Sequence, residues 1–340
     1  MLGGILSAIV VVGGFFGDEG KGKVVAYLAI KRRIQLAVRC GAINAGHTVV
    51  YRGRTWKLRS VPSAFIYPGA QLGIAAGSLI RLDVLFKEIE ETGCRDRLCV
   101  DYNAGIIEEE HALREKSSNH LATTIGSTLQ GVGEAMVDRV RRVLKLARDS
   151  PELKDYTCDL AGKVNEYIDR GSEVLIEGTQ GTFLSLYHGT YPYVTSRDTT
   201  ASAFLSEVGV GPKKVSEVIV VFKSYVTRVG PGPLRGEIPF EEATKLGWIE
   251  YGTVTGRPRR VAPFDFELAK RAVTLNSATG VAITKIDALF PEVRGLRDRS
   301  KLPRSVREWV EKVESTLKVP VKLLGTGEDV EDAIYLGDED

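Results

Sequence analysis

The segment from Gly17 to Lys23 combines glycines with two lysines, the residue types that bind phosphate groups. Glycines let backbone N–H groups surround phosphate oxygens, lysines supply positive charge, and the N-terminus of a following helix favours an anion. The segment follows the apolar run 9–12 and precedes a helical pattern from about Lys21, which is the context of a phosphate-binding loop. The alternative is a glycine-rich turn with solvated charges. The residues that we expect to contact a nucleotide are Gly17, Glu19, Gly20, Lys21, Gly22 and Lys23.

The same loop lacks the hydroxyl that usually holds a metal. Gly17, Gly22 and Lys23 match the spacing G-x-x-x-x-G-K, but Val24 stands where a serine or threonine normally binds Mg²⁺. Asp18 is the nearest substitute, because a carboxylate among phosphate-binding amides can both ligate Mg²⁺ and accept a proton from a substrate. The loop therefore predicts Mg²⁺-dependent phosphate chemistry around Asp18.

A second motif, Thr284-Lys285-Ile286-Asp287, follows an apolar run and matches the T/N-K-x-D pattern that selects guanine. The Asp287 carboxylate can accept hydrogen bonds from N1–H and the 2-amino group of guanine, whereas adenine has neither donor. Adenine would leave this acceptor unpaired, at a cost of about 1 to 3 kcal/mol. The motif therefore predicts a preference for GTP, although a lysine and an aspartate at a strand end can also form a surface ion pair.

Three further polar segments carry side chains that fold stability does not require. The segment 44–48 places His47 in a polar loop, although a single histidine is often a structural group. The segment 177–182 follows a strand, and its Gln180 can both donate to and accept from a base; the alternative is an ordinary turn. The segment 252–260 brings three arginines between glycines, which suits carboxylates and phosphates, although a solvated basic loop has the same composition.

Composition places the chain among soluble enzymes. Its 340 residues are 43% hydrophobic and carry a net charge of +2, so no strong field favours nucleic acid or an anionic membrane. The four cysteines include no C-x-x-C pair, and we interpret them as core thiols in a reducing cytoplasm. The apolar start, 1–12, lacks a basic region and runs into the phosphate loop, so it predicts a first buried strand rather than a signal peptide.

Short apolar runs alternate with amphipathic segments, which predicts an α/β fold with a central, mostly parallel sheet covered by helices. No linker or low-complexity tract divides the chain, so we expect a single large domain over 1–340 with a P-loop-like phosphate site and a frayed acidic end, 337–340. The expected strands after the first are 36–39, 72–76, 174–177, 218–222, 281–286 and 321–324. The expected helices after the first are 82–91, 136–148, 266–275 and 306–317.

Taken together, these motifs resemble one family, adenylosuccinate synthetase, whose members join IMP and L-aspartate at the expense of GTP. Further agreement is found in the segments 189–196, 227–230 and 325–327, so that the similarity covers most of the chain in the same order. The chain resembles a short form, because it lacks material after the helix that contains Arg142 and between Asp287 and Gly325. The resemblance implies a GTP-dependent ligase of purine biosynthesis that acts in the cytoplasm.

The resemblance also implies catalytic roles. Asp18 would be the general base that removes the N1 proton of IMP and a ligand of Mg²⁺, to which Gly46 would add a backbone oxygen. His47 would be the general acid, and Gln180 would assist at the base. The 6-oxygen of IMP would attack the γ-phosphorus of GTP, and the amine of aspartate would then displace phosphate from the 6-phosphoryl intermediate.

Binding roles follow from the same resemblance. IMP would contact Asn44, Thr128, Gln180, Thr195 and Arg257, with Arg142 reaching the nucleotide of the partner subunit in a homodimer. L-Aspartate would be held by Thr253, Val254, Thr255 and Gly256, where Val254 replaces a hydroxyl residue of the family. Beyond the phosphate loop, GTP would contact Gly46, Thr48, Arg259, Lys285, Asp287, Gly325, Thr326 and Gly327.

Two alternatives from the residues remain open. A GTP-binding switch protein uses a similar loop and guanine motif, but it needs a hydroxyl on Mg²⁺ and a D-x-x-G segment that senses the γ-phosphate. Val24 replaces the hydroxyl, and no well-placed D-x-x-G segment is found. Another GTP-dependent ligase, acting on a different amine or carboxylate, is compatible with Gln180 and the arginine segment.

Overall fold

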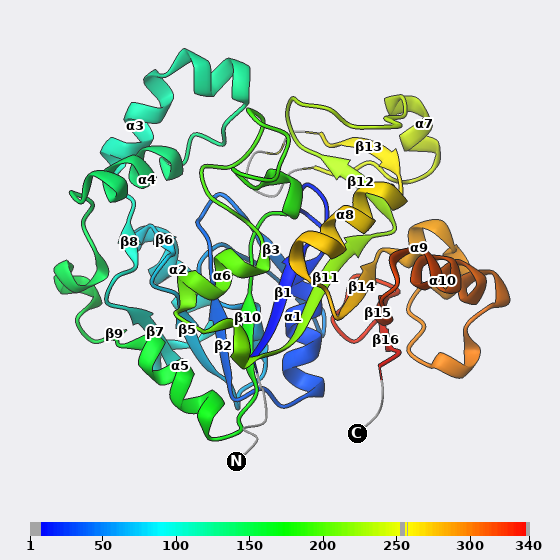
Figure 1. Ribbon diagram of the computed structural model, residues 1–340, viewed down its shortest axis with the longest axis horizontal. Coiled ribbons are helices and arrows are strands. Elements are labelled where there is room, and N and C mark those ends of the chain that lie inside the picture. Colours follow the sequence, from blue (N-terminus) through cyan, green and yellow to red (C-terminus); the bar gives the residue numbers. More distant parts are fainter. Residues whose placement is uncertain (1–7, 252–255, 257, 338–340) are drawn as a thin grey trace.

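The computed structural model describes residues 8–251, 256 and 258–337, and its centre is a ten-stranded sheet (Figure 1). Every neighbouring pair of strands in this sheet is parallel except the edge pair of β15 with β16, which is antiparallel. The strand order is β16 (Ala333–Tyr335), β15 (Val321–Gly325), β14 (Gly280–Thr284), β11 (Val215–Lys223), β1 (Ala8–Gly13), β10 (Val174–Glu177), β2 (Leu36–Arg39), β5 (Gln71–Ile74), β7 (Leu98–Asp101) and β9 (Thr157–Cys158).

The central strand β1 shows why the sheet is buried on both faces. Alternate side chains of a strand point to opposite faces, so Val10 and Val12 pack into one hydrophobic cluster whereas Ile9 and Val11 pack into another. All six residues of β1 are buried. A continuous apolar run is therefore what a parallel strand between two helical layers requires.

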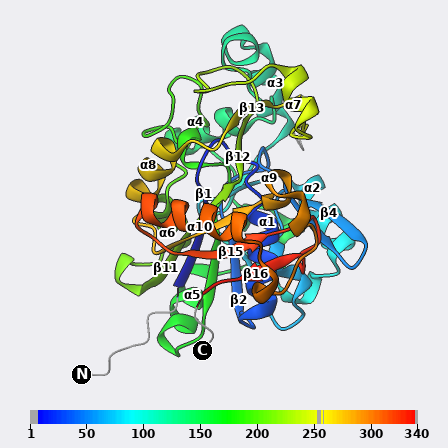
Figure 2. The same cartoon turned by 90° about the vertical axis from the view of Figure 1, so that its right-hand side faces the viewer.

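Helices cover both faces of the sheet. Helices α1 and α2 contribute to the cluster that contains Ile9, whereas α5, α6, α8 and α10 contribute to the cluster that contains Val10. Figure 2 shows α6 and α8 on one side of the strands and α1 and α2 on the other. The helices are α1 (Lys21–Lys31), α2 (Leu82–Thr92), α3 (Glu109–Ser117), α4 (Val132–Arg141), α5 (Leu160–Asp169), α6 (Ala201–Val208), α7 (Phe240–Lys245), α8 (Phe266–Asn276), α9 (Ile286–Leu289) and α10 (Arg304–Leu317).

Smaller elements stand beyond one end of the sheet, where Figures 1 and 2 both place α3, α4, α7 and β13. One antiparallel hairpin belongs to this group, β12 (Tyr225–Arg228) with β13 (Arg260–Pro263). A second hairpin, β3 (His47–Tyr51) with β4 (Arg54–Leu58), packs into the same hydrophobic cluster as α1 and α2. A short parallel pair joins β6 (Leu79–Ile80) to β8 (Gly105–Ile106). Among the described residues, no helix has the length and apolar character that crossing a membrane requires.

Each expected strand and four of the five expected helices are present with small shifts of their ends, and the α/β prediction is confirmed. The helix expected over 136–148 is wrong, because α4 begins at Val132 and ends at Arg141. Arg142 adopts a left-handed backbone conformation with φ of 64°, and the N–H of Val143 bonds back to the carbonyl of Asp138, which terminates the helix. His47 lies not in a loop but at the start of β3.

The interpretation of all four cysteines as core thiols is wrong for two of them. Cys99 and Cys158 form a disulfide, whereas Cys40 and Cys94 are free and buried. The two bonded residues lie on β7 and β9, which are neighbouring parallel strands, and their Cα atoms are 6.1 Å apart. They are separated by 59 residues in the chain, so only the strand pairing, which the sequence pattern did not reveal, brings them together.

Candidate active site

Residues that follow neighbouring parallel strands meet around one cavity of about 1120 Å³. Ligands of open α/β sheets bind at the carboxyl ends of the strands, and this cavity lies there. Segments after β1, β2, β10, β11, β14 and β15 all contribute to its wall. The expected site residues that line it are Gly17, Asp18, Gly20, Lys21, Gly22, Lys23, Asn44, Gly46, His47, Thr48, Thr128, Gln180, Thr195, Gly256, Arg259, Lys285 and Gly327.

The phosphate loop connects β1 to the N-terminus of α1, as expected. The first turn of α1 passes so close to β3 that a Cβ on Gly22 would lie 2.9 Å from the carbonyl oxygen of Thr48 and 3.0 Å from Cβ of His47. Only glycine allows this approach, which brings the loop and His47 to the same cavity. Asp18 has a φ of 61°, an unusual conformation for a non-glycine residue, and its side chain lines the cavity.

Glu19 is buried and does not line the cavity. The predicted contact of its side chain with a nucleotide is therefore not supported by the structure. One of its carboxylate oxygens accepts hydrogen bonds from the N–H groups of Phe15 at 3.0 Å and Gly17 at 2.8 Å. The other oxygen pairs with Nζ of Lys21 at 2.6 Å, and Lys21 also donates to the carbonyl oxygen of Gln180. Both charged side chains are buried. Glu19 therefore shapes the loop and fixes the ammonium group of Lys21, a residue that also lines the cavity.

Lys23 links the loop to the C-terminal part of the chain. Its Nζ donates to the carbonyl oxygens of Gly327 at 2.9 Å, Asp332 at 2.8 Å and Asp329. Burial lowers the pKa of Lys23 to about 8, although nearby aspartates oppose this shift. The lysine therefore retains its charge at neutral pH with a smaller margin than an exposed lysine.

His47 is held by a buried carboxylate that the motif analysis did not single out. Nδ1 of His47 lies 2.5 Å from Oε1 of Glu177, and the same oxygen accepts hydrogen bonds from Arg39 and from the hydroxyl of Ser63, both at 2.6 Å. Glu177 is completely buried. Burial alone would raise the pKa of Glu177, but the charge of Arg39 and the hydrogen bonds hold it at about 2.

The opposite nitrogen of His47, Nε2, is buried and has no hydrogen-bond partner among the described residues. Nδ1 also lies 2.6 Å from Nη1 of Arg39, so the tautomer decides the role of each ring nitrogen. In the tautomer whose Nδ1 donates to Glu177, Nε2 of the neutral ring is an acceptor. Burial and the charge of Arg39 lower the pKa of His47 to about 3, so the imidazole is neutral in the ligand-free protein. A negative ligand in the cavity would raise this pKa.

Three residues expected to bind the same nucleotide contact one another. The side-chain amide of Gln180 donates to Oδ1 of Asn44 at 3.0 Å and to the hydroxyl of Thr195 at 3.2 Å. The hydroxyl of Thr179 donates to the amide oxygen of Gln180 at 2.9 Å and sets its orientation. These groups come from after β2, after β10 and from the loop before α6, and they form one polar wall of the cavity.

The guanine motif lies beside the phosphate loop. The hydroxyl of Thr284 donates to the carbonyl oxygen of Glu19 at 2.7 Å, which ties the motif to the loop. Asp287 is buried; Oδ2 pairs with Nε of Arg294 at 3.3 Å, whereas Oδ1 has no partner within the part of the chain that the structure describes. An unpartnered buried carboxylate oxygen is costly unless a ligand or water pairs with it. Gly325, which ends β15, and Thr326 do not line the cavity, and Gly325 lies next to the aliphatic part of Lys23.

The remaining expected contacts are placed as follows. Thr128 lies in the loop after the π-helix His120–Ile125 and lines the cavity. Arg142 is exposed at the end of α4 and does not line the cavity of its own chain. The expected aspartate contacts Thr253, Val254 and Thr255 and the expected IMP contact Arg257 lie outside the described residues.

Comparisons with known proteins bear on this site. The adenylosuccinate synthetase family model matches residues 10–148 and 143–294. Adenylosuccinate synthetases of Methanocaldococcus jannaschii and Archaeoglobus fulgidus are 49% and 50% identical to the chain, and each match covers 98% of the chain and 98% or 99% of the relative. The chain belongs to the adenylosuccinate synthetase family. Its activity is that of a GTP-dependent ligase that uses IMP and aspartate in purine biosynthesis.

Solved structures agree with this assignment. The fully ligated adenylosuccinate synthetase from Plasmodium falciparum superposes with a TM-score of 0.89 at 23% identity, covering 97% of this chain and 99% of that one, which shows a shared fold. Cyanophage S-2L succinoaminodeoxyadenylate synthetase, solved with dGMP and with dATP as an energy donor, has a TM-score of 0.82 at 26% identity, covering 98% of this chain and 96% of that one. The archaeal relatives match end to end, so the short form is confirmed.

The motif analysis of this synthetase missed Glu250 and Lys223, two charged residues that join Arg259 beside Asp18. Arg259 pairs with Asp18 at 3.0 Å and with Glu250, and Glu250 pairs with Lys223 at 2.7 Å. Burial raises the pKa of Asp18, and the charges of Arg259 and Lys223 oppose the rise. One signal for Lys223 was present in the sequence, because a lysine directly follows the apolar run 218–222 at the carboxyl end of a strand.

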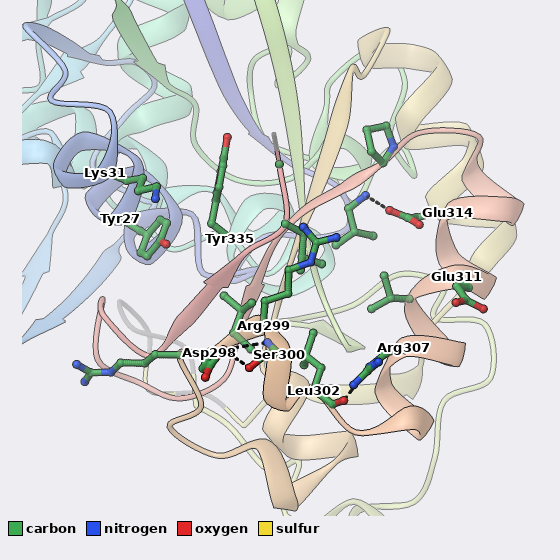
Figure 3. A pocket seen from close by; sticks show the side chains of 17 residues that line it. Tyr27, Lys31, Asp298, Arg299, Ser300, Leu302, Arg307, Glu311, Glu314 and Tyr335 are labelled. Carbon is green, nitrogen blue, oxygen red and sulfur yellow. Dashed lines mark hydrogen bonds between the residues drawn. The ribbon is translucent and has the colours of Figure 1, made fainter. Parts of the chain in front are cut away.

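A second cavity, of about 1160 Å³, lies apart from the synthetase site (Figure 3). It is bounded by α1, α10 and the C-terminal strands, and side chains such as Arg299, Arg307, Glu311 and Tyr335 surround it. Its charged lining residues carry both signs, and none of them is buried. None of the family motifs reaches it, so the first cavity is the candidate active site.

Proposed function

We propose that the reaction takes place in the first cavity, with Asp18 as general base and His47 as general acid. The observation that carries this proposal is that Asp18, His47 and Gln180 line one cavity between the phosphate loop and the guanine motif. Asp18 would remove the N1 proton of IMP, and the 6-oxygen would attack the γ-phosphorus of GTP. The amine of aspartate would then displace phosphate from C6. The transfer requires mainly positioning and charge stabilisation, which Lys21 and His47 can supply.

In this proposal His47 gains its catalytic proton only after substrates bind. The triphosphate brings negative charge close to Nε2, which raises the pKa of the imidazole. Glu177 keeps Nδ1 as a donor throughout, because its own carboxylate stays ionised. A histidine that is neutral in the free protein and cationic in the complex would stabilise the charge that develops on the transferred phosphoryl group.

Mg²⁺ fits the residues present. The Asp18 carboxylate and the backbone of Gly46 both line the cavity, and oxygen ligands of this kind suit a hard cation. Within the described part of the chain, no three carboxylate, histidine or cysteine side chains form a metal cluster, so phosphate oxygens and water would complete the coordination. When bound, Mg²⁺ would neutralise charge on the phosphates. Asp18 would have to exchange its ion pair with Arg259 for the metal.

The substrates would divide the cavity between them. IMP would lie along the wall of Asn44, Gln180 and Thr195, and Thr128 would contact it from the other side. GTP would place its phosphates on the loop 17–23 and at Thr48, and its base at Lys285 and Asp287, with Arg259 and the segment 325–327 nearby. L-Aspartate would be held by the segment 253–257, with Gly256 lining the cavity.

The overall activity is tested by incubating the protein with GTP, Mg²⁺ and IMP, with and without L-aspartate. We expect phosphate release and adenylosuccinate absorbance only with all components. ATP in place of GTP distinguishes the nucleotide preference, and other amines in place of aspartate distinguish another ligase. GTP hydrolysis without IMP would instead favour a switch protein.

Lys23 gives the proposal a pH dependence. The kcat/KM for GTP is expected to fall as pH rises through about 8, because the free protein then loses the positive charge of Lys23, whose ordinary pKa is 10.5. Lys23→Arg keeps its charge at these pH values and should move the fall to higher pH. Initial rates at limiting GTP between about pH 7 and about pH 9.5 provide the measurement. Superimposable profiles of the two proteins would exclude Lys23 as the titrating group.

We also propose that the enzyme is a homodimer in which Arg142 contacts IMP of the partner subunit. Arg142 is exposed and is not among the residues that line the cavity of its own chain, and the neighbouring side chains Val140 and Val143 are 69% and 68% exposed. Exposed β-branched apolar residues beside a cation suit a protein interface.

The single-domain organisation over 1–340 is likewise our proposal, and the cytoplasmic location stays a prediction.

Subunit mixing tests the shared site. Arg142→Leu and Asp18→Asn should each be nearly inactive alone, yet an equal mixture should regain up to about a quarter of the activity, because about half of the dimers are then mixed and one of the two sites in each inherits both intact residues. Exchange of subunits is verified independently by light scattering of tagged protein. A flat mixing curve despite verified exchange would rule out a site shared between subunits.

A further inference from the structure

Glu250 connects three other side chains at the edge of the active-site cavity. Its Oε2 accepts a hydrogen bond from Nζ of Lys223 at 2.7 Å and pairs with Nη1 of Arg259, and its Oε1 accepts the hydroxyl of Tyr225. We name these four residues the Glu250 cluster. Lys223 is 3% exposed in its side chain and Arg259 is 8% exposed, so both cations are shielded from water. Buried cations of this kind need a fixed anionic partner.

The cluster joins segments that lie far apart in the chain. Lys223 ends β11, whose neighbour β1 leads directly into the phosphate loop. Tyr225 begins β12 and stacks on Trp248, with ring centres 4.8 Å apart and an angle of 5° between the planes. Arg259 directly precedes β13, and its backbone N–H bonds to the carbonyl oxygen of Glu250 at 2.9 Å. The carboxylate of Glu250 is therefore held in a rigid surrounding.

Arg259 connects this cluster to Asp18. Nη1 of Arg259 faces Glu250, whereas Nη2 lies 3.0 Å from Oδ2 of Asp18. The charges of Lys223 and Arg259 balance those of Glu250 and Asp18. Lys223 pairs with Glu250, whereas Arg259 pairs with both carboxylates. Without Glu250, Lys223 would lose its only carboxylate partner among the described residues and would be attracted to Asp18, the next nearby carboxylate.

We infer that Glu250 is a positioning residue for Asp18, because it retains Lys223 and orients Arg259, so that Arg259 is the one cation of the described residues that contacts the Asp18 carboxylate. This inference rests on the proposed function, in which Asp18 is the base. Glu250 acts through the two cations and does not itself contact the reacting atoms. A lysine released onto Asp18 would compete for the carboxylate that must face IMP.

The test compares Glu250→Gln with the wild-type protein by kcat, KM for IMP and thermal unfolding. We expect kcat to fall at least ~10-fold while the KM for IMP stays within about twofold, because hydrogen bonds among Asn44, Gln180 and Thr195 themselves hold the proposed IMP wall. Glu250→Asp keeps the charge on a shorter side chain and should recover part of kcat. The matched control is Glu237→Gln, which breaks the exposed ion pair with Arg260 on the same hairpin and should leave kcat unchanged.

A double variant separates positioning from a merely structural role. Lys223→Met in the Glu250→Gln background removes the competing cation and the buried unpaired charge, so it should fold and raise kcat at least about threefold above Glu250→Gln. If Glu250→Gln does not fold, the double variant is compared with Lys223→Met alone, and a kcat no higher than one tenth of Lys223→Met would overturn the inference. A Glu250→Gln protein that keeps more than half of kcat, or a double variant without recovery, would also overturn it. An inactive wild-type protein would instead refute the proposed function, and the inference with it.

Discussion

Asp18→Asn is expected to lose at least ~10²-fold in kcat at saturating Mg²⁺ and substrates. The change keeps the size of the side chain but removes the proton acceptor for N1 of IMP and weakens the metal site. It also removes one charge from the ion pair with Arg259, which remains paired with Glu250. The fold should therefore survive, and the loss should appear in turnover rather than in thermal unfolding.

The control for this variant is Asp298→Asn, which changes an exposed carboxylate at the second cavity. It should have the wild-type kcat. Adenylosuccinate formation is followed by absorbance for all three proteins, and GDP binding by calorimetry verifies that the nucleotide site is intact. If Asp18→Asn retained more than a tenth of the wild-type kcat, Asp18 would not be the base.

Asp287→Asn is expected to lower kcat/KM for GTP by about 10- to 100-fold, the effect of a charged acceptor that no longer pairs with two guanine donors. The unpartnered Oδ1 of Asp287 is the acceptor in question. The asparagine amide can accept once but also presents a donor, which suits the 2-oxygen of xanthine, so discrimination against XTP should diminish. The KM for IMP serves as the internal control and should stay unchanged.

The choice of base is a property of the site rather than of the fold. The related cyanophage synthetase was solved with dATP as its energy donor, on the same fold. Competition of GTP, XTP and ATP in the wild-type and variant proteins therefore measures how much Asp287 contributes to the choice of base. An unchanged ratio of kcat/KM for GTP and XTP would remove Asp287 from the role of reading the base.

Much of the sheet could be predicted because its strands are buried on both faces. A continuous apolar run such as Val10 to Val12 followed by glycines leaves few alternatives to a central parallel strand and a phosphate loop. Helix ends were predicted less well. The helix through Asp138 continues its apolar periodicity past Arg142, but the left-handed conformation of Arg142 ends it, and no glycine marks that position.

The candidate site shows the same division. Asp18, His47 and Gln180 lie in motifs of unusual composition and could be found from the sequence, whereas Glu250 and Arg39 are charged residues without a distinctive context. Their importance comes from burial and from partners far along the chain, such as Glu177 for Arg39 at 2.6 Å. Long-range pairs of this kind, like the disulfide between Cys99 and Cys158, depend on tertiary structure that residue patterns do not contain.

The position of β1 in the middle of the sheet has a consequence for how the chain folds. Ala8 pairs with Val174 on one side and with Val215 on the other, so β1 waits during synthesis for partners that are made much later. Both of its edges and its apolar side chains stay unpaired in a nascent chain, which is a state prone to aggregation. Pairings so distant in sequence form slowly. We therefore expect the nucleotide-binding end of this protein to be among its last parts to form, and added GTP to protect the finished fold without speeding its initial assembly.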